Sequence, residues 1–131
     1  MLDVPMDYFT LPEMGSALGS GALLIMDDSH CIVDIAESFM RFFARESCGK
    51  CVPCREGTAR LHDIVKNIAH GNGTEKDLEV LKDLSHAMEK TSLCGLGQSA
   101  PIPIMTMLKY FGDEFEAHIK DKLCPTGTCR L

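Results

Sequence analysis

Three cysteines spaced by two residues, Cys48, Cys51 and Cys54, constrain this chain more than any other feature of its sequence. Thiolates in a C-x2-C-x2-C run can wrap one face of a cuboidal iron–sulfur cluster, and Gly49 lets the backbone come close to it. A [4Fe–4S] cluster takes four cysteines, and a C-x2-C-x2-C-x3-C run would place the fourth at position 58, which is Thr58 here. The fourth ligand is therefore expected from a distant part of the chain.

Composition and charge exclude several classes of protein. A chain of 131 residues that is 45% hydrophobic and 24% charged is typical of one folded domain, or one domain with an appendage. Its net charge of −6 argues against binding to nucleic acid or to an acidic membrane surface. The longest apolar run, residues 22–26, is far shorter than the ~20 residues of a membrane helix, and no signal-peptide pattern opens the chain. The odd number of cysteines, seven, favours metal binding in a reducing compartment over disulfides, so we expect a soluble, cytoplasmic protein.

Apolar residues recur at helical spacing from Cys31 onward and predict four short amphipathic helices. The first carries its apolar face on Ile32, Ala36 and Phe43, and the second begins after Cys54. A capping box at residues 74–77 predicts the start of the third helix. Prolines 101 and 103 suit the start of the fourth, which should run to about residue 121 with a bend at Gly112. The fold class expected is mainly α, a small four-helix bundle that holds the cluster.

Residues 1–30 have a different pattern. Residues 15–21 are glycine-rich and loop-like, and Ala22–Met26 is interpreted as one buried strand. A single strand has no partner of its own here, so we expect the end of a sheet whose other strands lie outside this chain or in residues 1–12. The expected organisation is a β segment over residues 1–30, a helical iron–sulfur bundle over 31–123 and a cysteine-rich tail over 124–131.

Cys94 is the best candidate for the distant fourth ligand. It lies between the third and fourth predicted helices, in the stretch Ser-Leu-Cys-Gly-Leu-Gly. Two helices separate it from Cys54, one leading out and one leading back, so the chain should return to the same end of the bundle. Zinc could use the same residues, although cysteine zinc sites favour two C-x2–4-C pairs. A redox-active thiol pair, Cys51 and Cys54, would need a βαβ context that the helical pattern opposes.

The residues around these cysteines resemble a known family. Glu-Ser-Cys-Gly-Lys-Cys-Val-Pro-Cys-Arg-Glu-Gly at 46–57, with Ser-Leu-Cys-Gly-Leu-Gly-Gln at 92–98, is similar to the C-terminal part of the NADH-binding flavoprotein subunit of respiratory complex I. The similarity is closer still to the corresponding subunit of soluble NAD(P)-linked [FeFe] hydrogenases and related electron-bifurcating enzymes. Residues 15–28 look like the end of the small β-grasp domain that precedes the bundle in that family, and 110–118 resembles its last bundle helix.

The resemblance implies one [4Fe–4S] cluster on Cys48, Cys51, Cys54 and Cys94, which takes electrons from the FMN of the preceding domain and passes them towards other clusters. The glycine-rich FMN and NADH loops are missing, so FMN and NAD(P) would bind only in the parent subunit, outside this chain. We therefore expect a fragment of a hydrogenase-type or complex I-type oxidoreductase subunit that does not catalyse in isolation. Its expected partners are the flavin- and NAD-binding domain and other iron–sulfur subunits, with no nucleic acid and no direct membrane insertion.

The other three cysteines, with one histidine, form a second candidate site. Cys124 and Cys129 flank a tight C-x4-C turn, His118 lies six residues before Cys124, and Cys31 lies where the first helix begins. Three thiolates and an imidazole make a tetrahedral set that is common for structural zinc, and it would clamp the tail to the start of the bundle. The resemblance suggests that hydrogenase-type members carry a similar set, which the complex I subunit lacks.

Other interpretations of the second set stay open. Cys31 could be a plain buried cysteine, and Cys124 and Cys129 could ligate a further cluster completed elsewhere. His118 could lie at the surface, and His30 competes with it, although in an extended chain His30 points away from Cys31. Three further histidines have no cysteine near them in sequence and are expected to be solvent-exposed: His62, His70 and His86.

The leading interpretation of function is an electron-transfer domain with one [4Fe–4S] cluster. It would relay electrons between the FMN of an NAD(P)H-oxidising or NAD(P)-reducing subunit and further clusters of a hydrogenase or complex I-like assembly. The alternative is a zinc-stabilised docking module without a redox role. Metal content separates these two interpretations, because the first requires iron and sulfide and the second requires zinc alone.

Overall fold

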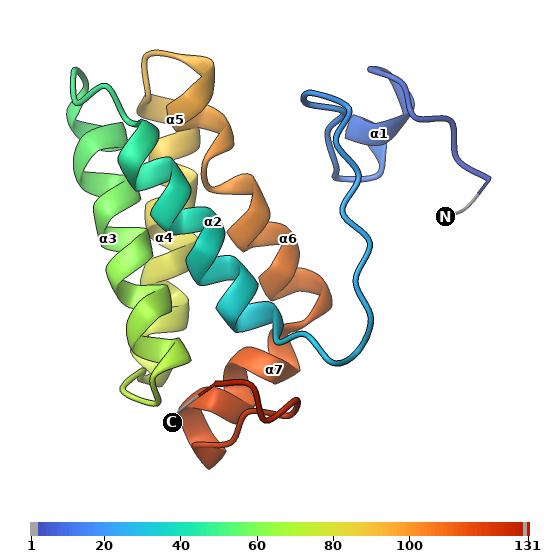
Figure 1. The fold of residues 1–131 in the computed structure, drawn as a ribbon. Coiled ribbons are helices and arrows are strands. Elements are labelled where there is room, and N and C mark those ends of the chain that lie inside the picture. Colours follow the sequence, from blue (N-terminus) through green and yellow to red (C-terminus); the bar gives the residue numbers. More distant parts are fainter. Residues whose placement is uncertain (1–2, 130) are drawn as a thin grey trace.

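Four helices form the body of the molecule. The structure, a computed structural model, describes residues 3–129 and 131, so residues 1, 2 and 130 of the expected segments lie outside the described residues. The helices α2 (Ile32–Glu46), α3 (Val52–Ala69), α4 (Glu75–Thr91) and α6 (Ile102–Tyr110) lie side by side (Figure 1). Each contacts the next, and α6 also contacts α2, so the four helices close a ring. The expected mainly α fold is confirmed.

The bundle runs up and down, which decides where its loops meet. Because successive helices run in opposite directions, the α2–α3 loop and the segment after α4 both lie at one end, beside the short helix α5 (Gly95–Ser99) (Figure 1). Helix α5 contacts both α3 and α4. The chain therefore returns Cys94 to the end of the bundle that carries the C-x2-C-x2-C loop, as the out-and-back argument predicted.

Local sequence accounts for the helix ends. The backbone N–H of Thr74 donates to Asp77 Oδ2 at 2.8 Å, so the capping box predicted for α4 is present. Gly71, with φ +73°, supplies the left-handed turn after α3. The prediction that α3 begins after Cys54 is wrong, because α3 begins at Val52. Pro53 is compatible with a first helical turn, and this brings Cys54 onto the helix.

The last predicted helix is divided into three parts. After α6, the chain breaks at Phe111 and continues as α7 (Gly112–Glu116), so the predicted bend at Gly112 is confirmed. Residues Ala117–Asp121 then form a π-helical turn, η1, which Lys122 ends in the left-handed region with φ 52°. Short π-helical turns often occur at functional sites. This turn carries His118.

The hydrophobic core lies inside the helical ring and, among the described residues, includes none that precedes Cys31. Its largest fully buried apolar side chains are Phe115, Met40, Leu61, Ile64, Ile68, Leu81, Met88 and Ile104. Gly57 of α3 allows α4 to approach closely, since a Cβ there would lie only 2.6 Å from Met88 Cγ. A side chain at position 57 would therefore have to displace the fully buried Met88 side chain.

A valine at position 57 is expected to destabilise the bundle. Gly57→Val would force Met88 and α4 outward, and such overpacking costs about 1–3 kcal/mol. Urea unfolding followed by circular dichroism measures the loss. The matched control is Gly112→Val, because the space around the Cβ position of Gly112 is empty within 4 Å. Equal free energies of unfolding for the two variants would contradict the packing argument.

The N-terminal segment lies beside the bundle and is mostly irregular. Apart from the short helix α1 (Thr10–Glu13), it has no regular structure over the described residues 3–30 (Figure 1). The strand predicted at residues 22–26 is not formed, and its residues are exposed, with Leu23 at 69% and Ile25 at 83%. This prediction of a buried strand is corrected for a physical reason: a strand is stable only in a sheet, and the described residues offer no other strand to pair with.

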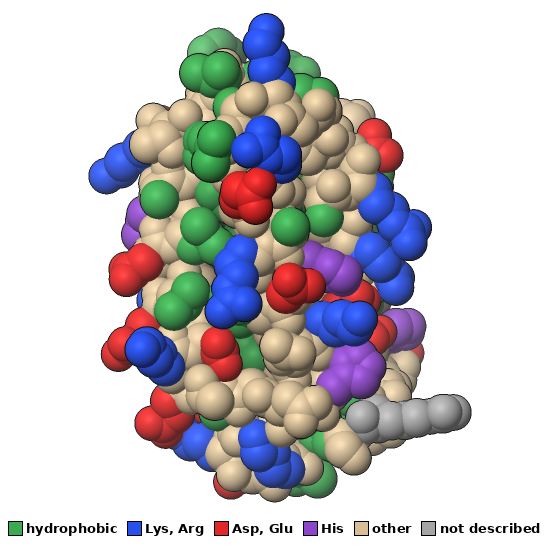
Figure 2. All heavy atoms as spheres, turned by 90° about the vertical axis from the view of Figure 1, so that its left-hand side faces the viewer, with side chains coloured by type: hydrophobic (Ala, Val, Ile, Leu, Met, Phe, Trp, Pro, Cys, Tyr) green, Lys and Arg blue, Asp and Glu red, His purple; other side chains and the backbone are tan. Residues whose placement is uncertain are grey.

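The surface of the bundle is mixed in charge. On the face that shows α3, Lys and Arg side chains alternate with Asp and Glu, and hydrophobic side chains are scattered between them (Figure 2). Among the described residues, no helix is both long enough and apolar enough to cross a bilayer.

Candidate metal centres

Four cysteines surround one cavity at the loop end of the bundle. The cavity measures about 130 Å³, and Cys48, Cys51, Cys54 and Cys94 all line it. Cys54 is buried, Cys51 is half-buried, and Cys48 and Cys94 are exposed. A single water needs a volume of only about 10–15 Å³, so the cavity has room for a group much larger than one ion. The structure therefore brings together the four cysteines that the sequence singled out.

The loop that carries three of these cysteines is held in shape by its own contacts. Gly49 adopts φ +75°, which favours glycine, and its carbonyl accepts a hydrogen bond from Arg55 Nη1 at 2.7 Å. Thr58 is fully buried and donates to the carbonyl of Cys54 at 2.8 Å. The backbone N–H groups of Leu93 and Cys54 lower the pKa of the Cys51 thiol below its ordinary value. The segment before Cys94 thus reaches across to the Cys51 sulfur.

The fit of a four-thiolate group can be tested at Gly97. A Cβ there would lie 2.9 Å from Cys54 Cβ and 2.6 Å from Ser92 Oγ, so only glycine lets α5 pack this tightly against the first turn of α3. The Ser92 hydroxyl is buried and has no hydrogen-bond partner. Ser92 is not among the residues that line the cavity, and Ser85 in α4 has a buried hydroxyl without a partner as well. The four thiols around one cavity, and the glycine that lets α5 approach Cys54, fit a group held by four thiolates, as a [4Fe–4S] cluster is.

The second set of candidate ligands, Cys31, His118, Cys124 and Cys129, is more compact than the four cysteines around the cavity. The ligand atoms of Cys31, His118, Cys124 and Cys129 all lie within 4.8 Å of one another. A tetrahedral zinc ion places two thiolate sulfurs about 3.8 Å apart and a sulfur and a nitrogen about 3.6 Å apart. Cys31 Sγ and His118 Nε2 are separated by 3.5 Å. Elsewhere in residues 3–129 and 131, no three or more His, Cys, Asp or Glu side chains bring their ligand atoms so close together. The second set is therefore more compact than the four cysteines around the cavity.

His118 is oriented for ligation by its second nitrogen. Its Nδ1 lies 2.7 Å from the carbonyl oxygen of Glu114, which can only accept, so Nδ1 carries the proton. Nε2 is then left with its lone pair toward the cysteines, the arrangement usual for a metal-binding histidine. The carboxylate of Glu114 also accepts a hydrogen bond from the Ile32 N–H at 3.3 Å. Glu114 thereby joins α7 to the start of α2, next to Cys31.

The surroundings of the three thiols of this set shift their pKa values in different directions. Burial opposes ionisation of Cys124, but the Thr126 hydroxyl, the Cys129 backbone N–H and the Thr128 hydroxyl outweigh it and lower the pKa of the Cys124 thiol to about 5. Burial raises the pKa of Cys31. Burial, and then the neighbouring sulfur of Cys31, raises that of Cys129. Without a metal, the pKa of Cys124 therefore lies below those of Cys31 and Cys129.

The two sets lie at opposite ends of one helix. Cys31 is the residue before α2, and the C-x2-C-x2-C loop follows its last residue. A helix of 15 residues is about 22 Å long, so the sets are separate sites. His30, the rival of His118, is exposed and pairs with Asp27 at 2.9 Å instead. His118, by contrast, is fully buried, so the alternative that it lies at the surface does not hold.

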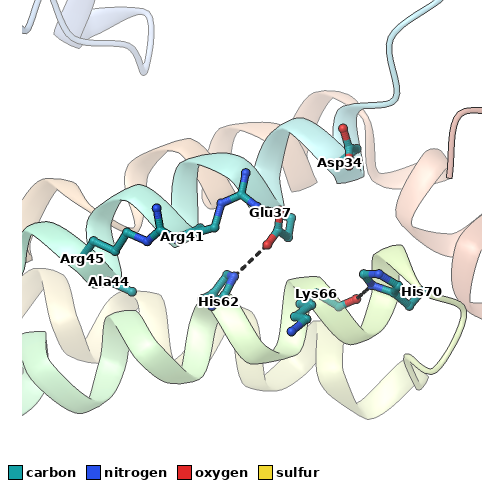
Figure 3. Close-up of a pocket in the computed structure, with 8 residues that line it drawn as sticks. All are labelled: Asp34, Glu37, Arg41, Ala44, Arg45, His62, Lys66 and His70. Carbon is teal, nitrogen blue, oxygen red and sulfur yellow. Dashed lines mark hydrogen bonds and ion pairs between the residues drawn. The ribbon is translucent and has the colours of Figure 1, made fainter. Parts of the chain in front are cut away.

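A further hollow of about 630 Å³ lies between α2 and α3, and no cysteine lines it (Figure 3). Its lining is Asp34, Glu37, Arg41, Ala44, Arg45, His62, Lys66 and His70. Glu37 accepts a hydrogen bond from His62 Nε2 at 2.8 Å and pairs with Arg41 at 3.6 Å. The prediction that His62 is solvent-exposed is wrong, because the facing helices half-bury it, whereas His70 and His86 are exposed as expected. The hydrogen bond between His62 and Glu37 joins α3 to α2.

A helical bundle with a four-cysteine cavity at one end and a Cys3His set at the other defines a metal-binding module. The model of the NADH-ubiquinone oxidoreductase-F iron–sulfur binding region matches residues 34–118. This range includes all four cysteines of the cavity, and His118 alone of the second set. The chain belongs to this family, and the resemblance found at residues 46–57 and 92–98 is confirmed.

Known relatives are longer than this chain. The NADP-reducing hydrogenase subunit HndC of Solidesulfovibrio fructosivorans is 46% identical over 128 residues, covering 98% of this chain and 26% of that protein. An NADH-quinone oxidoreductase subunit of Streptomyces coelicolor is 44% identical over 124 residues, covering 95% and 28%. A crystal structure of an NAD+-reducing [NiFe]-hydrogenase in the H2-reduced state matches with a TM-score of 0.70 at 40% identity, covering 72% of this chain and 17% of that chain. The chain thus spans about a quarter of the curated relatives' length.

Proposed function

We propose that this chain is an electron-transfer domain that binds one [4Fe–4S] cluster through Cys48, Cys51, Cys54 and Cys94. The observation that carries the proposal is the gathering of these four cysteines around one cavity from two separate parts of the chain. Membership of an iron–sulfur binding family supports it. When bound, the cluster supplies a one-electron redox centre; the protein holds it by four thiolates and excludes water from the Cys54 side, which is buried.

The proposal extends to the assembly around the chain. Its relatives are named as subunits of an NADP-reducing hydrogenase and of NADH-quinone oxidoreductases. We therefore assign FMN and NAD(P) binding to the parent subunit, outside this chain. We further propose other iron–sulfur subunits as partners. The electrons would pass between that FMN and those clusters, and the chain alone would not catalyse. Val52 and Leu93 are exposed beside Cys51 and Cys94, as expected where another protein covers the cluster end.

The second metal proposal concerns structure rather than electron transfer. Cys31, His118, Cys124 and Cys129 have the ligand types and spacing of a structural zinc site. Zinc there would clamp the tail at 124–131 to the start of the bundle at 31–123. The segment 1–30 keeps its interpretation as the end of a β-grasp domain. Its exposed apolar residues 23–25 support this, since they would need a sheet outside this chain to cover them.

Metal content of anaerobically purified protein tests both assignments. We expect about four irons, four acid-labile sulfides and one zinc per chain, with visible absorption that bleaches on reduction by dithionite. Four irons and four sulfides without zinc would keep the electron-transfer function and remove the zinc site. Zinc without iron, in protein made under iron-replete conditions, would contradict the electron-transfer function and favour a zinc-stabilised docking module.

A further inference from the structure

Cys54 differs from the other three cysteines of the cavity in its surroundings. It is only 4% exposed, whereas Cys48 and Cys94 are exposed. Its sulfur lies 3.3 Å from the hydroxyl oxygen of Ser47, a side chain–side chain contact across the start of the cysteine loop. Ser47 therefore faces one thiol of the proposed cluster site directly.

The direction of this hydrogen bond follows from the state of the cysteine. In the free thiol either atom can be the donor. A cysteine that ligates a metal has lost its proton, so the Ser47 hydroxyl must then donate to the Cys54 sulfur. Ser47 Oγ also accepts a hydrogen bond from the backbone N–H of Gly49 at 3.4 Å. That bond occupies a lone pair and leaves the hydroxyl hydrogen for Cys54, and successive hydrogen bonds of this kind polarise one another.

Ser47 is held in place by the backbone around it. Its own N–H donates to the carbonyl of Phe43 at 3.1 Å, which fixes it to the last turn of α2. Arg55 Nη1 donates to the Gly49 carbonyl, which fixes the next part of the loop to α3. The hydroxyl thus projects from a loop anchored to both helices, as a fixed donor must.

We propose that Ser47 is a positioning residue for electron transfer, which donates a hydrogen bond to the Cys54 thiolate and raises the reduction potential of the cluster. This rests on the proposed function. The electron that reduces the cluster adds negative charge that its sulfur ligands share, so a donor to sulfur stabilises the reduced state more than the oxidised state. Removal of the donor makes the cluster harder to reduce.

The test is an anaerobic redox titration followed by visible absorption and electron paramagnetic resonance, with iron measured in each sample. We expect Ser47→Ala to keep its iron and to titrate at a more negative potential. At a fixed solution potential, its ratio of oxidised to reduced cluster should rise about tenfold, as for loss of a hydrogen bond to a charged acceptor. Ser47→Thr retains a hydroxyl and should titrate as the unmodified protein does.

Two further variants separate the effect of the Ser47 hydroxyl on the reduction potential from the effect of side-chain packing. Ser47→Val has nearly the shape of Ser47→Thr without the hydroxyl, and it should reproduce the shift of Ser47→Ala. Ser99→Ala is the matched control, because Ser99 lies in α5 at the same end of the bundle but bonds to the Leu96 carbonyl. Its potential should not change.

The outcomes distinguish this inference from the proposed function. Unmodified protein without an iron–sulfur cluster would refute the function, and the inference with it. A normal cluster whose potential is the same in the valine and threonine variants would overturn the inference alone. Loss of iron in the alanine and valine variants but not in the threonine variant would also overturn it, since Ser47 would then retain the cluster rather than set its potential.

Discussion

Replacement of Cys94 by alanine is expected to lower the bound iron while the bundle stays folded. Cys94 is exposed in the turn before α5, so the loss of its side chain leaves no cavity in the core. The cysteines at 48, 51 and 54 alone cannot complete the four-thiolate set of a [4Fe–4S] cluster. Iron should fall from about four per chain to three or fewer, and the visible absorption should bleach.

Iron and sulfide analysis, with circular dichroism as the measure of folding, checks this result. Leu93→Ala is the matched control, because Leu93 is 74% exposed in the same loop and its backbone N–H toward Cys51 survives the substitution. It should keep its full complement of iron. Full iron and an unchanged spectrum in Cys94→Ala would exclude Cys94 as a ligand and leave the cavity without its fourth thiolate.

The helices could be predicted because each has a local sequence pattern of its own. On the face predicted for α2, Ile32 and Ala36 are buried, and Phe43 is half-buried against the core. Thr74 and Asp77 form the capping box that their spacing predicted. These features depend on residues one or two turns apart, and no distant contact is needed to recognise them.

The grouping of the candidate ligands needed one further step. Cys48, Cys51 and Cys54 are near neighbours in sequence, but Cys94 could be joined to them only by counting helices and their directions. The second set, Cys31, His118, Cys124 and Cys129, could be proposed only from its ligand types, because three thiolates and an imidazole are common at structural zinc sites. The structure brings each set together. That either set binds metal stays a prediction, as do the boundaries of the three segments.

Other features depend on contacts that no local pattern records. The run 22–26 has the composition of a strand, but a strand needs partners that the described residues do not supply. His62 and Glu37 are 25 positions apart, and only the register of α2 against α3 brings them together. The π-helical turn that carries His118 has no signature in its residues. The contact of Ser47 with Cys54 likewise depends on where Pro53 lets α3 begin.

The zinc assignment predicts a large effect from one buried side chain. His118→Ala should lower zinc from about one per chain to near zero, since the three remaining thiols lose the fully buried imidazole that faces Cys31. Loss of a structural metal ranks among the largest single-residue effects, so the free energy of unfolding should fall by about 3–5 kcal/mol. Iron content should not change, because the cysteine cavity lies at the other end of α2.

Unfolding measured with and without zinc separates two effects of His118→Ala on stability. One is the loss of the metal, and the other is the cavity that the missing imidazole leaves. In chelator-treated protein, His118→Ala should be less stable than the unmodified chain only by the cost of that cavity. Added zinc should then stabilise the unmodified chain and not the variant, because binding to the folded state alone shifts the unfolding equilibrium. His30→Ala is the matched control, since His30 is next to Cys31 but is exposed and paired with Asp27. Equal stabilisation of His118→Ala by zinc, or loss of zinc from His30→Ala, would show that the imidazole of His118 does not hold the ion.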